Sequence, residues 1–169
     1  MPFTQRQNKP TTGCRPEDFA QFHPEGTLGR RLLLRAADVM HCGERLPVVR
    51  ASDAFDHALV VMTNKSLGLA VIVDEAGKLI GVFTDGDLRR LSSRVRDWHV
   101  LDARAAHAQS RRPTGATAVV ASTIRAELPA IECLRLMREQ QITSLVVIDD
   151  DDKPIGLVRL QDVVNAGLA

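Results

Sequence analysis

The sequence predicts an α/β (α+β) fold in which two β-α-β-β-α units pack as a pseudo-two-fold pair. Two observations support this fold: one stretch of chain occurs twice, and the apolar residues of each copy show helix spacing followed by strand spacing. The composition agrees, because 169 residues with 44% hydrophobic and 25% charged residues are typical of one globular domain or of two small ones.

The repeat appears when Val49 is laid over Ile124 and the alignment continues without a gap to Asp87 over Asp162. A register held over this length indicates a duplicated structural unit. Each copy is small for a core of its own, so we expect the two sheets to pack together. The identical pairs are Arg50/Arg125, Ala51/Ala126, Leu59/Leu134, Met62/Met137, Val71/Val146, Asp74/Asp149, Lys78/Lys153, Ile80/Ile155, Gly81/Gly156 and Asp87/Asp162.

Each unit is predicted to begin with a strand and an amphipathic helix. Ser52-Asp53 offers a helix cap in the first unit, and Pro129 suits a first helical turn in the second. Cys133 lies on the apolar stripe of the second helix, where a free cysteine usually packs as a small hydrophobe. The stripes are Phe55, Ala58, Leu59 and Met62 in the first unit, and Ala130, Cys133, Leu134 and Met137 in the second.

Two short apolar runs follow each helix and predict a buried hairpin. Their short length and their β-branched residues favour strands over helices, and polar turns separate them. Each hairpin then leads into a second helix. The predicted strands are Leu69–Asp74 and Lys78–Phe83 in the first unit, and Ser144–Asp149 and Lys153–Val158 in the second.

The junction between the last strand and the last helix carries the most chemical information. In the first unit Thr84 and Asp87 lie where the backbone N–H groups of a helix start can hold a phosphate. The Thr84 hydroxyl suits a phosphate or sugar oxygen, and the Asp87 carboxylate can accept two ribose hydroxyl protons. The same Thr-x-x-Asp pattern also fits a capping box, which would make both residues structural. Two junctions that face each other would form a cleft of the kind that binds ligands.

The Gly-hydrophobic-x-Thr/Ser-x-x-Asp pattern at this junction resembles the CBS domain, and the whole repeat resembles the tandem CBS pair called a Bateman module. Gly81, Thr84 and Asp87 match the pattern in the first unit. In the second unit the Gly and Asp162 match, but Arg159 replaces the Thr or Ser. Arg159 either brings positive charge to an anionic ligand shared across the cleft or is a solvated side chain.

Three longer runs are similar to the C-terminal half of arabinose-5-phosphate isomerases of the KpsF/GutQ type: EDFAQFHPEGTLGRRLL, LGLAVIVDEAGKLIGVFTDGDLRRL and LQDVVNAGLA. The resemblance implies a parent protein with an N-terminal sugar isomerase (SIS) domain that is absent here. His23 matches the family's active-site-proximal histidine, and no catalytic residue is expected in this chain. The expected domains are a tail and remnant of the SIS-to-CBS connection at 1–36, CBS domain 1 at 37–93, a partly helical linker at 94–117 and CBS domain 2 at 118–169.

The resemblance implies that the parent enzyme interconverts ribulose 5-phosphate and arabinose 5-phosphate for Kdo and lipopolysaccharide synthesis. We expect this chain to be its regulatory part, inactive alone, needing no cofactor and binding a nucleotide or a nucleotide-sugar such as CMP-Kdo. The expected partners are a second copy, bound through the CBS pair, and the SIS domain of the full-length parent. The expected ligand-binding residues are Thr84, Asp85, Asp87, Val49, Gly68, Leu69, Arg159, Asp162, Thr143 and Ser144.

Two other functions are compatible with the sequence. One is a structural dimerisation module with degenerate ligand sites, in which Arg159 is the sign of decay. The other is an adenylate-sensing CBS protein, which would prefer AMP or ATP over cytidine nucleotides.

Several classes of function are not expected. A net charge of +1, from 22 Lys plus Arg and 21 Asp plus Glu, gives no field that would hold nucleic acid. No apolar run approaches the roughly 18 residues of a transmembrane helix. The three cysteines form no CxxC pair, so we expect no disulfide framework and a cytoplasmic location. The histidines show no metal-ligand spacing, and the arginines that follow Thr84 are interpreted as a solvated helix face: Arg89, Arg90, Arg94 and Arg96.

Overall fold

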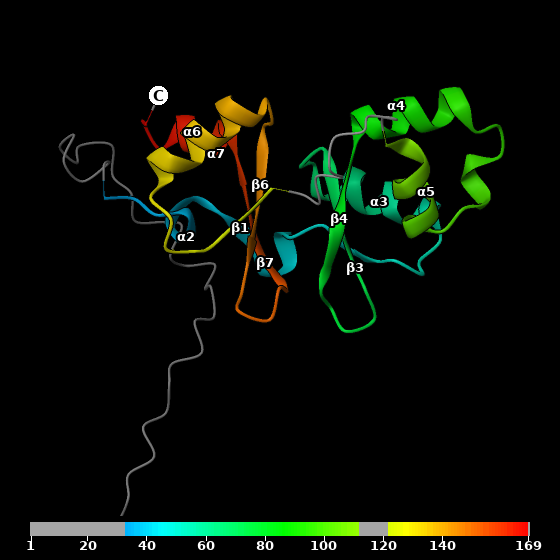
Figure 1. The fold of residues 1–169 in the computed structure, drawn as a ribbon, viewed down its shortest axis with the longest axis horizontal. Helices are drawn as coiled ribbons and strands as arrows, with labels where there is room; N and C mark the ends of the chain where they lie inside the picture. The colour runs from blue at the N-terminus through cyan, green and yellow to red at the C-terminus, as the bar shows by residue number, and fades with distance from the viewer. Residues whose placement is uncertain (1–32, 112–121, 169) are drawn as a thin grey trace, which may run out of the picture.

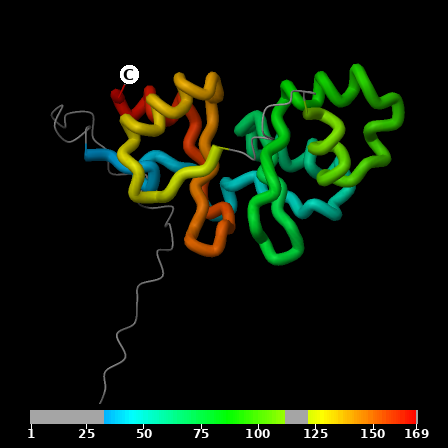
Figure 2. Tube along the Cα trace, in the orientation of Figure 1, coloured from blue at the N-terminus to red at the C-terminus, as the bar shows by residue number. Residues whose placement is uncertain are grey.

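Two units lie side by side in the computed structural model, which describes residues 33–111 and 122–168 (Figure 1). Each unit has one sheet, and the two sheets face each other in the middle of the molecule with the helices on the outer sides. The tube view shows the same separation into two bodies (Figure 2). The predicted α+β fold with two repeated units is confirmed.

The first unit contains a three-stranded sheet of order β2-β3-β4. Strands β2 and β3 are parallel, and β3 and β4 form the predicted antiparallel hairpin. All five residues of β3 are buried, as expected for a strand covered on both faces. The elements are β2 (Val48–Arg50), α3 (Phe55–Lys65), β3 (Leu69–Val73), β4 (Leu79–Thr84), α4 (Asp85–Arg94), the 3-10 turn η3 (Trp98–Val100) and α5 (Ala103–Ser110).

The second unit repeats this arrangement and adds one strand, which gives a sheet of order β1-β7-β6-β5. Strands β5 and β6 are parallel, β6 and β7 form the second hairpin, and β1 pairs antiparallel with β7. The elements are α2 (Ala36–Val39), β1 (His41–Cys42), the 3-10 turn η2 (Gly43–Arg45), β5 (Thr123–Ile124), α6 (Ala130–Gln140), β6 (Ser144–Ile148), β7 (Pro154–Arg159) and α7 (Leu160–Asn165).

Each unit is completed by a segment outside the repeat, here called its closing segment: residues 101–110 for the first unit and 34–42 for the second. The N–H of Ala103 donates to the Asp53 carbonyl over 2.9 Å. The N–H of Ala36 donates over 2.7 Å to the carbonyl of Leu128, which is the repeat equivalent of Asp53. Helix α2 therefore precedes the first unit in the chain but packs into the core of the second.

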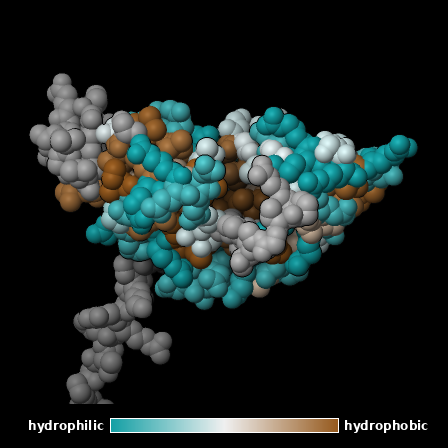
Figure 3. All heavy atoms as spheres, turned by 45° about the horizontal axis from the view of Figure 1, so that its top comes forward, coloured by the Kyte–Doolittle hydropathy of each residue, from teal (hydrophilic) through white to brown (hydrophobic). Residues whose placement is uncertain are grey.

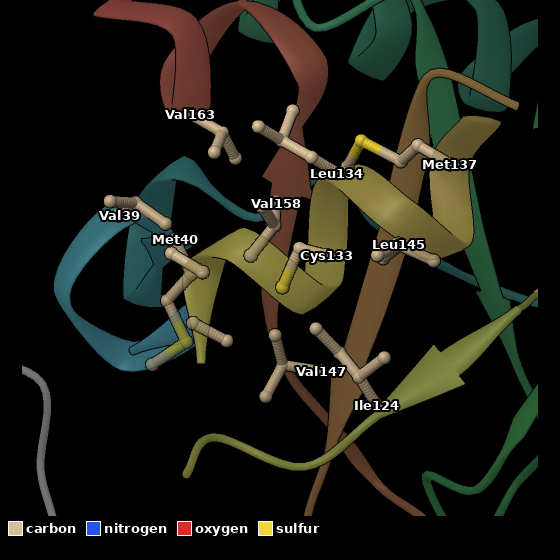
Figure 4. Packing of buried hydrophobic residues seen from close by; sticks show 12 residues of the cluster. Val39, Met40, Ile124, Cys133, Leu134, Met137, Leu145, Val147, Val158 and Val163 are labelled. Atoms are coloured by element: carbon tan, nitrogen blue, oxygen red, sulfur yellow. The ribbon is translucent and has the colours of Figure 1, made fainter. Parts of the chain in front are cut away.

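The core of the second unit gathers side chains from α2, α6, α7 and three strands around Cys133 (Figure 4). Cys133 is fully buried, which confirms its predicted place on the apolar stripe. The first unit has a matching core around Phe55, whose ring packs edge-on against Phe83 and Trp98. A third cluster joins the two sheets and contains Leu46, Leu69, Val71, Val146 and Leu157.

Two local expectations are wrong. The N-cap of α3 is Ala54, and Asp53 instead accepts the N–H of Arg50 over 2.8 Å, which closes the turn before the helix. Cys42 is disulfide-bonded while Cys133 is a free thiol, which differs from the expectation of no disulfide. Cysteine count and spacing do not show which residues approach each other in space. Cys14 and His23 lie outside the described residues.

Candidate functional site

The first junction is built where β4 ends at Thr84 and α4 begins at Asp85. The N–H and the hydroxyl of Thr84 both donate to Oδ2 of Asp87, over 2.9 and 2.6 Å. The N–H of Asp87 donates back to the Thr84 hydroxyl over 3.3 Å. The capping box offered by the sequence as an alternative is thus present, and it fixes both side chains at the start of the helix.

Arg90 connects this junction to the closing segment of the first unit. Its Nη2 donates to Oδ1 of Asp87 over 2.6 Å, and its Nε donates to the Ser110 carbonyl over 3.2 Å. Arg94 donates in the same way to the Arg111 carbonyl over 2.9 Å. Interpreting Arg90 as part of a solvated face was therefore wrong. Its position one helical turn after Asp87 was the available signal.

His107 brings α5 close to β4 just before the junction. A Cβ placed on Gly81 would lie 2.6 Å from the His107 ring, so only glycine admits this approach. Burial and the nearby Arg111 charge lower the pKa of His107 below its ordinary value of 6.5, while Asp87 opposes the shift. This contact could not be predicted from the sequence, because Gly81 and His107 are far apart in the chain.

The second junction uses different chemistry at the equivalent positions. Arg159 donates to Asp162 with two guanidinium nitrogens, Nε to Oδ2 and Nη2 to Oδ1, each over 3.0 Å. His41 from β1 places its Nε2 2.9 Å from Oδ2 of Asp162. Burial acts to raise the pKa of Asp162, but Arg159 and His41 together hold this pKa below its usual range. The contact with His41 could not be anticipated, since it depends on the pairing of β1 with β7.

The structure brings most of the predicted ligand-binding residues to the two junctions. Leu69 is paired with Thr84 across the first hairpin, and a Cβ on the adjacent Gly68 would lie 3.7 Å from a carboxylate oxygen of Asp85. Gly68 has φ +72, a conformation that favours glycine. Val49 differs, since it lies in the middle of β2, paired with Ile72 and buried in the core of the first unit.

At the second junction the corresponding residues of the hairpin take the same places. Ser144 is paired with Arg159, and the carbonyl of Thr143 accepts the N–H of Leu160 over 2.9 Å. Both junctions therefore combine the start of one strand, the end of its partner and the first turn of a helix.

The two junctions lie on the same side of the molecule, since β4 and β7 both run toward it and the hairpin turns lie at the opposite side (Figure 1). Seen with this side turned forward, the surface is hollowed between the two units and apolar side chains line the hollow (Figure 3). Another open cavity lies beside β5 and the start of α6, with Thr123, Arg125 and Pro129 in its lining, and it includes none of the predicted ligand-binding residues.

The part of the chain that the structure describes contains neither a group of metal ligands nor a membrane-spanning helix. Within residues 33–111 and 122–168, no group of three or more His, Cys, Asp or Glu side chains is placed to hold a metal ion. No helix in the same part of the chain is long and apolar enough to cross a membrane.

Comparison with known proteins assigns the repeat. The CBS domain family matches residues 36–94 and 117–169, which include both sheets and both junctions. The chain belongs to the CBS domain family. The CBS pair expected from the Gly81, Thr84 and Asp87 pattern is thereby confirmed.

The curated relatives of this CBS pair are larger proteins. The chain is 45% identical over 159 residues to "Arabinose 5-phosphate isomerase KdsD" of Pseudomonas aeruginosa, covering 92% of the chain and 45% of that protein. It is 39% identical over 156 residues to the protein of the same name from Escherichia coli K12, covering 92% and 44%. The chain thus spans less than half the length of these relatives, and the part it matches is their CBS region.

Solved structures show the same fold. CBSX2, determined in complex with AMP, is similar with a TM-score of 0.63 at 25% identity, covering 79% of this chain and 96% of CBSX2. A putative acetoin utilization protein (AcuB) from Vibrio cholerae has a TM-score of 0.65 at 16% identity, covering 81% and 92%.

Proposed function

We propose that this CBS pair is the regulatory part of an arabinose 5-phosphate isomerase and that it binds a nucleotide at the Thr84–Asp87 junction. In this proposal the parent protein interconverts ribulose 5-phosphate and arabinose 5-phosphate, and the SIS domain expected from the resemblance performs that chemistry. The observation that carries the ligand site is the geometry of Thr84 and Asp87 at the start of α4.

The junction offers complementary groups to a ribose phosphate. The Asp87 carboxylate is an acceptor for ribose hydroxyls, and the Thr84 hydroxyl can turn from Asp87 toward a phosphate or sugar oxygen. Asp85 and Asp87 already place negative charge at the helix start. This charge favours sugar hydroxyls over a second anion at the carboxylate itself, and it leaves the phosphate to the Thr84 side of the junction.

Two classes of nucleotide are the leading ligands. CBSX2 was solved in complex with AMP, which supports an adenylate as the ligand of this CBS pair. A cytidine nucleotide-sugar such as CMP-Kdo is the alternative, because a pathway end product would serve as a feedback signal for the proposed enzyme. Regulation then requires that the ligand bind two states of the enzyme with different affinities.

A thermal-shift panel of AMP, ADP, ATP, CMP and CMP-Kdo tests this function. A ligand present at one hundred times its Kd stabilises the folded chain by about 2.7 kcal/mol, and at this size each kcal/mol raises Tm by about 2–4 °C. We expect one ligand class to raise Tm and Asp87→Asn to abolish that rise. Asp102→Ala is the matched control, since it removes the cap of α5 without touching the junction.

A structural dimerisation module is the second candidate, because the capping box satisfies Thr84 and Asp87 without any ligand. In that case no nucleotide would raise Tm. Thr84→Ala would lower the stability of the folded chain by about 0.5–2 kcal/mol, which is the usual effect of losing a helix cap. Light scattering near twice the 18.5 kDa of one chain would support dimerisation. A monomer that binds a nucleotide would refute the dimerisation function and support the regulatory function.

A further inference from the structure

We propose that Arg159 closes the second junction, so that the CBS pair takes one nucleotide per chain, at the first junction only. The inference rests on the proposed function, which supplies the nucleotide. Asp87 and Asp162 occupy equivalent positions in the repeat, but their side chains have different hydrogen-bond partners.

Asp162 has no carboxylate oxygen left without a cationic partner. The guanidinium of Arg159 spans both oxygens, each over 3.0 Å, in the two-pronged geometry that Arg forms with carboxylates. The backbone N–H of Arg159 also donates to Oδ2 over 3.2 Å. A ribose hydroxyl at this carboxylate would have to displace a charge-assisted pair.

His41, which lies outside the repeat, adds a fourth contact to Asp162. The side chains of His41 and Asp162 are 12% and 15% exposed, and that of Asp87 is 16% exposed, so the two carboxylates differ in their partners and not in their burial. His41 is held there because β1 pairs antiparallel with β7, with His41 opposite Leu157. The junction is thus covered by the closing segment of the second unit as well as by Arg159.

Asp87 at the first junction has an exchangeable partner instead. Its Oδ2 is bound by the Thr84 hydroxyl, which a ribose hydroxyl can replace one for one without separating charges. Arg90 binds the other oxygen, Oδ1, and also donates to the Ser110 carbonyl of α5. Arg90 therefore spans only one oxygen of Asp87, whereas Arg159 spans both oxygens of Asp162. A threonine side chain is also shorter than the arginine side chain at the equivalent position.

Isothermal titration calorimetry with AMP, repeated with CMP, measures the number of sites per chain. We expect one site in the unmodified chain and two in Arg159→Thr, which recreates the side chain of the first junction. Adding Asp162→Asn to Arg159→Thr is expected to return the count to one. Arg135→Thr is the matched control, because it removes an exposed arginine from α6 and leaves both junctions intact.

The outcomes separate this inference from the proposed function. Two sites in the unmodified chain, or one site both in the unmodified chain and in a folded Arg159→Thr, would overturn the closure by Arg159 and leave nucleotide binding in place. No binding by either protein would overturn both proposals. One site in Arg159→Thr and none in the unmodified chain would refute binding at Thr84–Asp87 and retain Arg159 as the closing residue. Arg159→Ser provides a second test if Arg159→Thr does not fold, as judged by circular dichroism.

Discussion

Single side chains decide how closely each closing segment approaches its sheet. Gly81 is in contact with His107 of α5, and the equivalent Gly156 is in contact with Met40 beside α2. The glycines are thus required for close packing as much as for the junction pattern in which the sequence places them. The sequence places both glycines in the junction pattern, but it does not indicate which side chains pack against them.

Gly81→Ala is expected to destabilise the first unit by about 1–3 kcal/mol, because the new methyl group overlaps the His107 ring. Chemical denaturation followed by circular dichroism measures the loss. Combining it with His107→Ala should recover part of the stability, since the smaller side chain makes room. Equal losses in the single and double variants would contradict this account.

His107 is expected to make stability depend on pH in the mildly acidic range. Its folded-state pKa is lowered, so on acidification the unfolded chain takes up its proton first. The contribution of neutral His107 to the free energy of unfolding is fully present above pH 6.5, the ordinary pKa of histidine. This contribution decreases as the pH falls from 6.5 to the lower folded-state pKa.

His107→Gln should flatten this part of the stability profile, measured by denaturation at a series of pH values between 5 and 8. The exposed His57 provides the control variant His57→Gln, for which the profile should keep its slope. An unchanged slope in His107→Gln would assign the dependence to another group.

The helices and hairpins follow closely from the sequence pattern. The stripe through Phe55, Ala58 and Met62 is buried, and both hairpins form where β-branched runs flank a polar turn. The sequence pattern does not predict where the closing segments pack, because α2 and α5 are short and do not share the register of the main repeat. The contacts of Arg90 with Ser110 and of His41 with Asp162 cannot be predicted in this way either, since they depend on where those segments dock.

Ala36 and Ala103 offer a matched test of the closing segments, because both are fully buried at equivalent positions of α2 and α5. A buried, unpaired carboxylate is expected to cost several kcal/mol. Ala103→Asp should therefore loosen the first unit and Ala36→Asp the second. Hydrogen exchange of β4 and β7 measures each effect, and loss of protection in the first unit of Ala36→Asp alone would refute the assignment of α2.

At the scale of the whole molecule, the cluster between the sheets joins two units that are small on their own. Val71 and Val146 are repeat equivalents, and both are buried in this shared cluster with Leu157. The sequence predicted that the sheets would pack together from the small size of each unit. The inequality of the two junctions comes instead from Arg159, whose replacement of Thr is visible in the sequence although its ion pair is not.

Leu157→Ala is expected to destabilise the whole pair by about 2–5 kcal/mol, as large-to-small changes in a core do. Because Leu157 contacts both sheets through the shared cluster, both units should lose stability together. Calorimetry should show one transition in the unmodified chain and one, at lower temperature, in the variant. Two separate transitions in the unmodified chain would show that the cluster does not couple the units.

The docking of residues 34–42 on the second unit also sets an order of events during synthesis. Everything needed for the first unit, from β2 to α5, is synthesised before β6 and β7. Strand β1 and helix α2 emerge earlier still, yet their partner β7 comes almost last. The earliest described segment must therefore wait, unpaired, until the second unit is complete, and no single break in the chain divides the molecule into two self-sufficient halves.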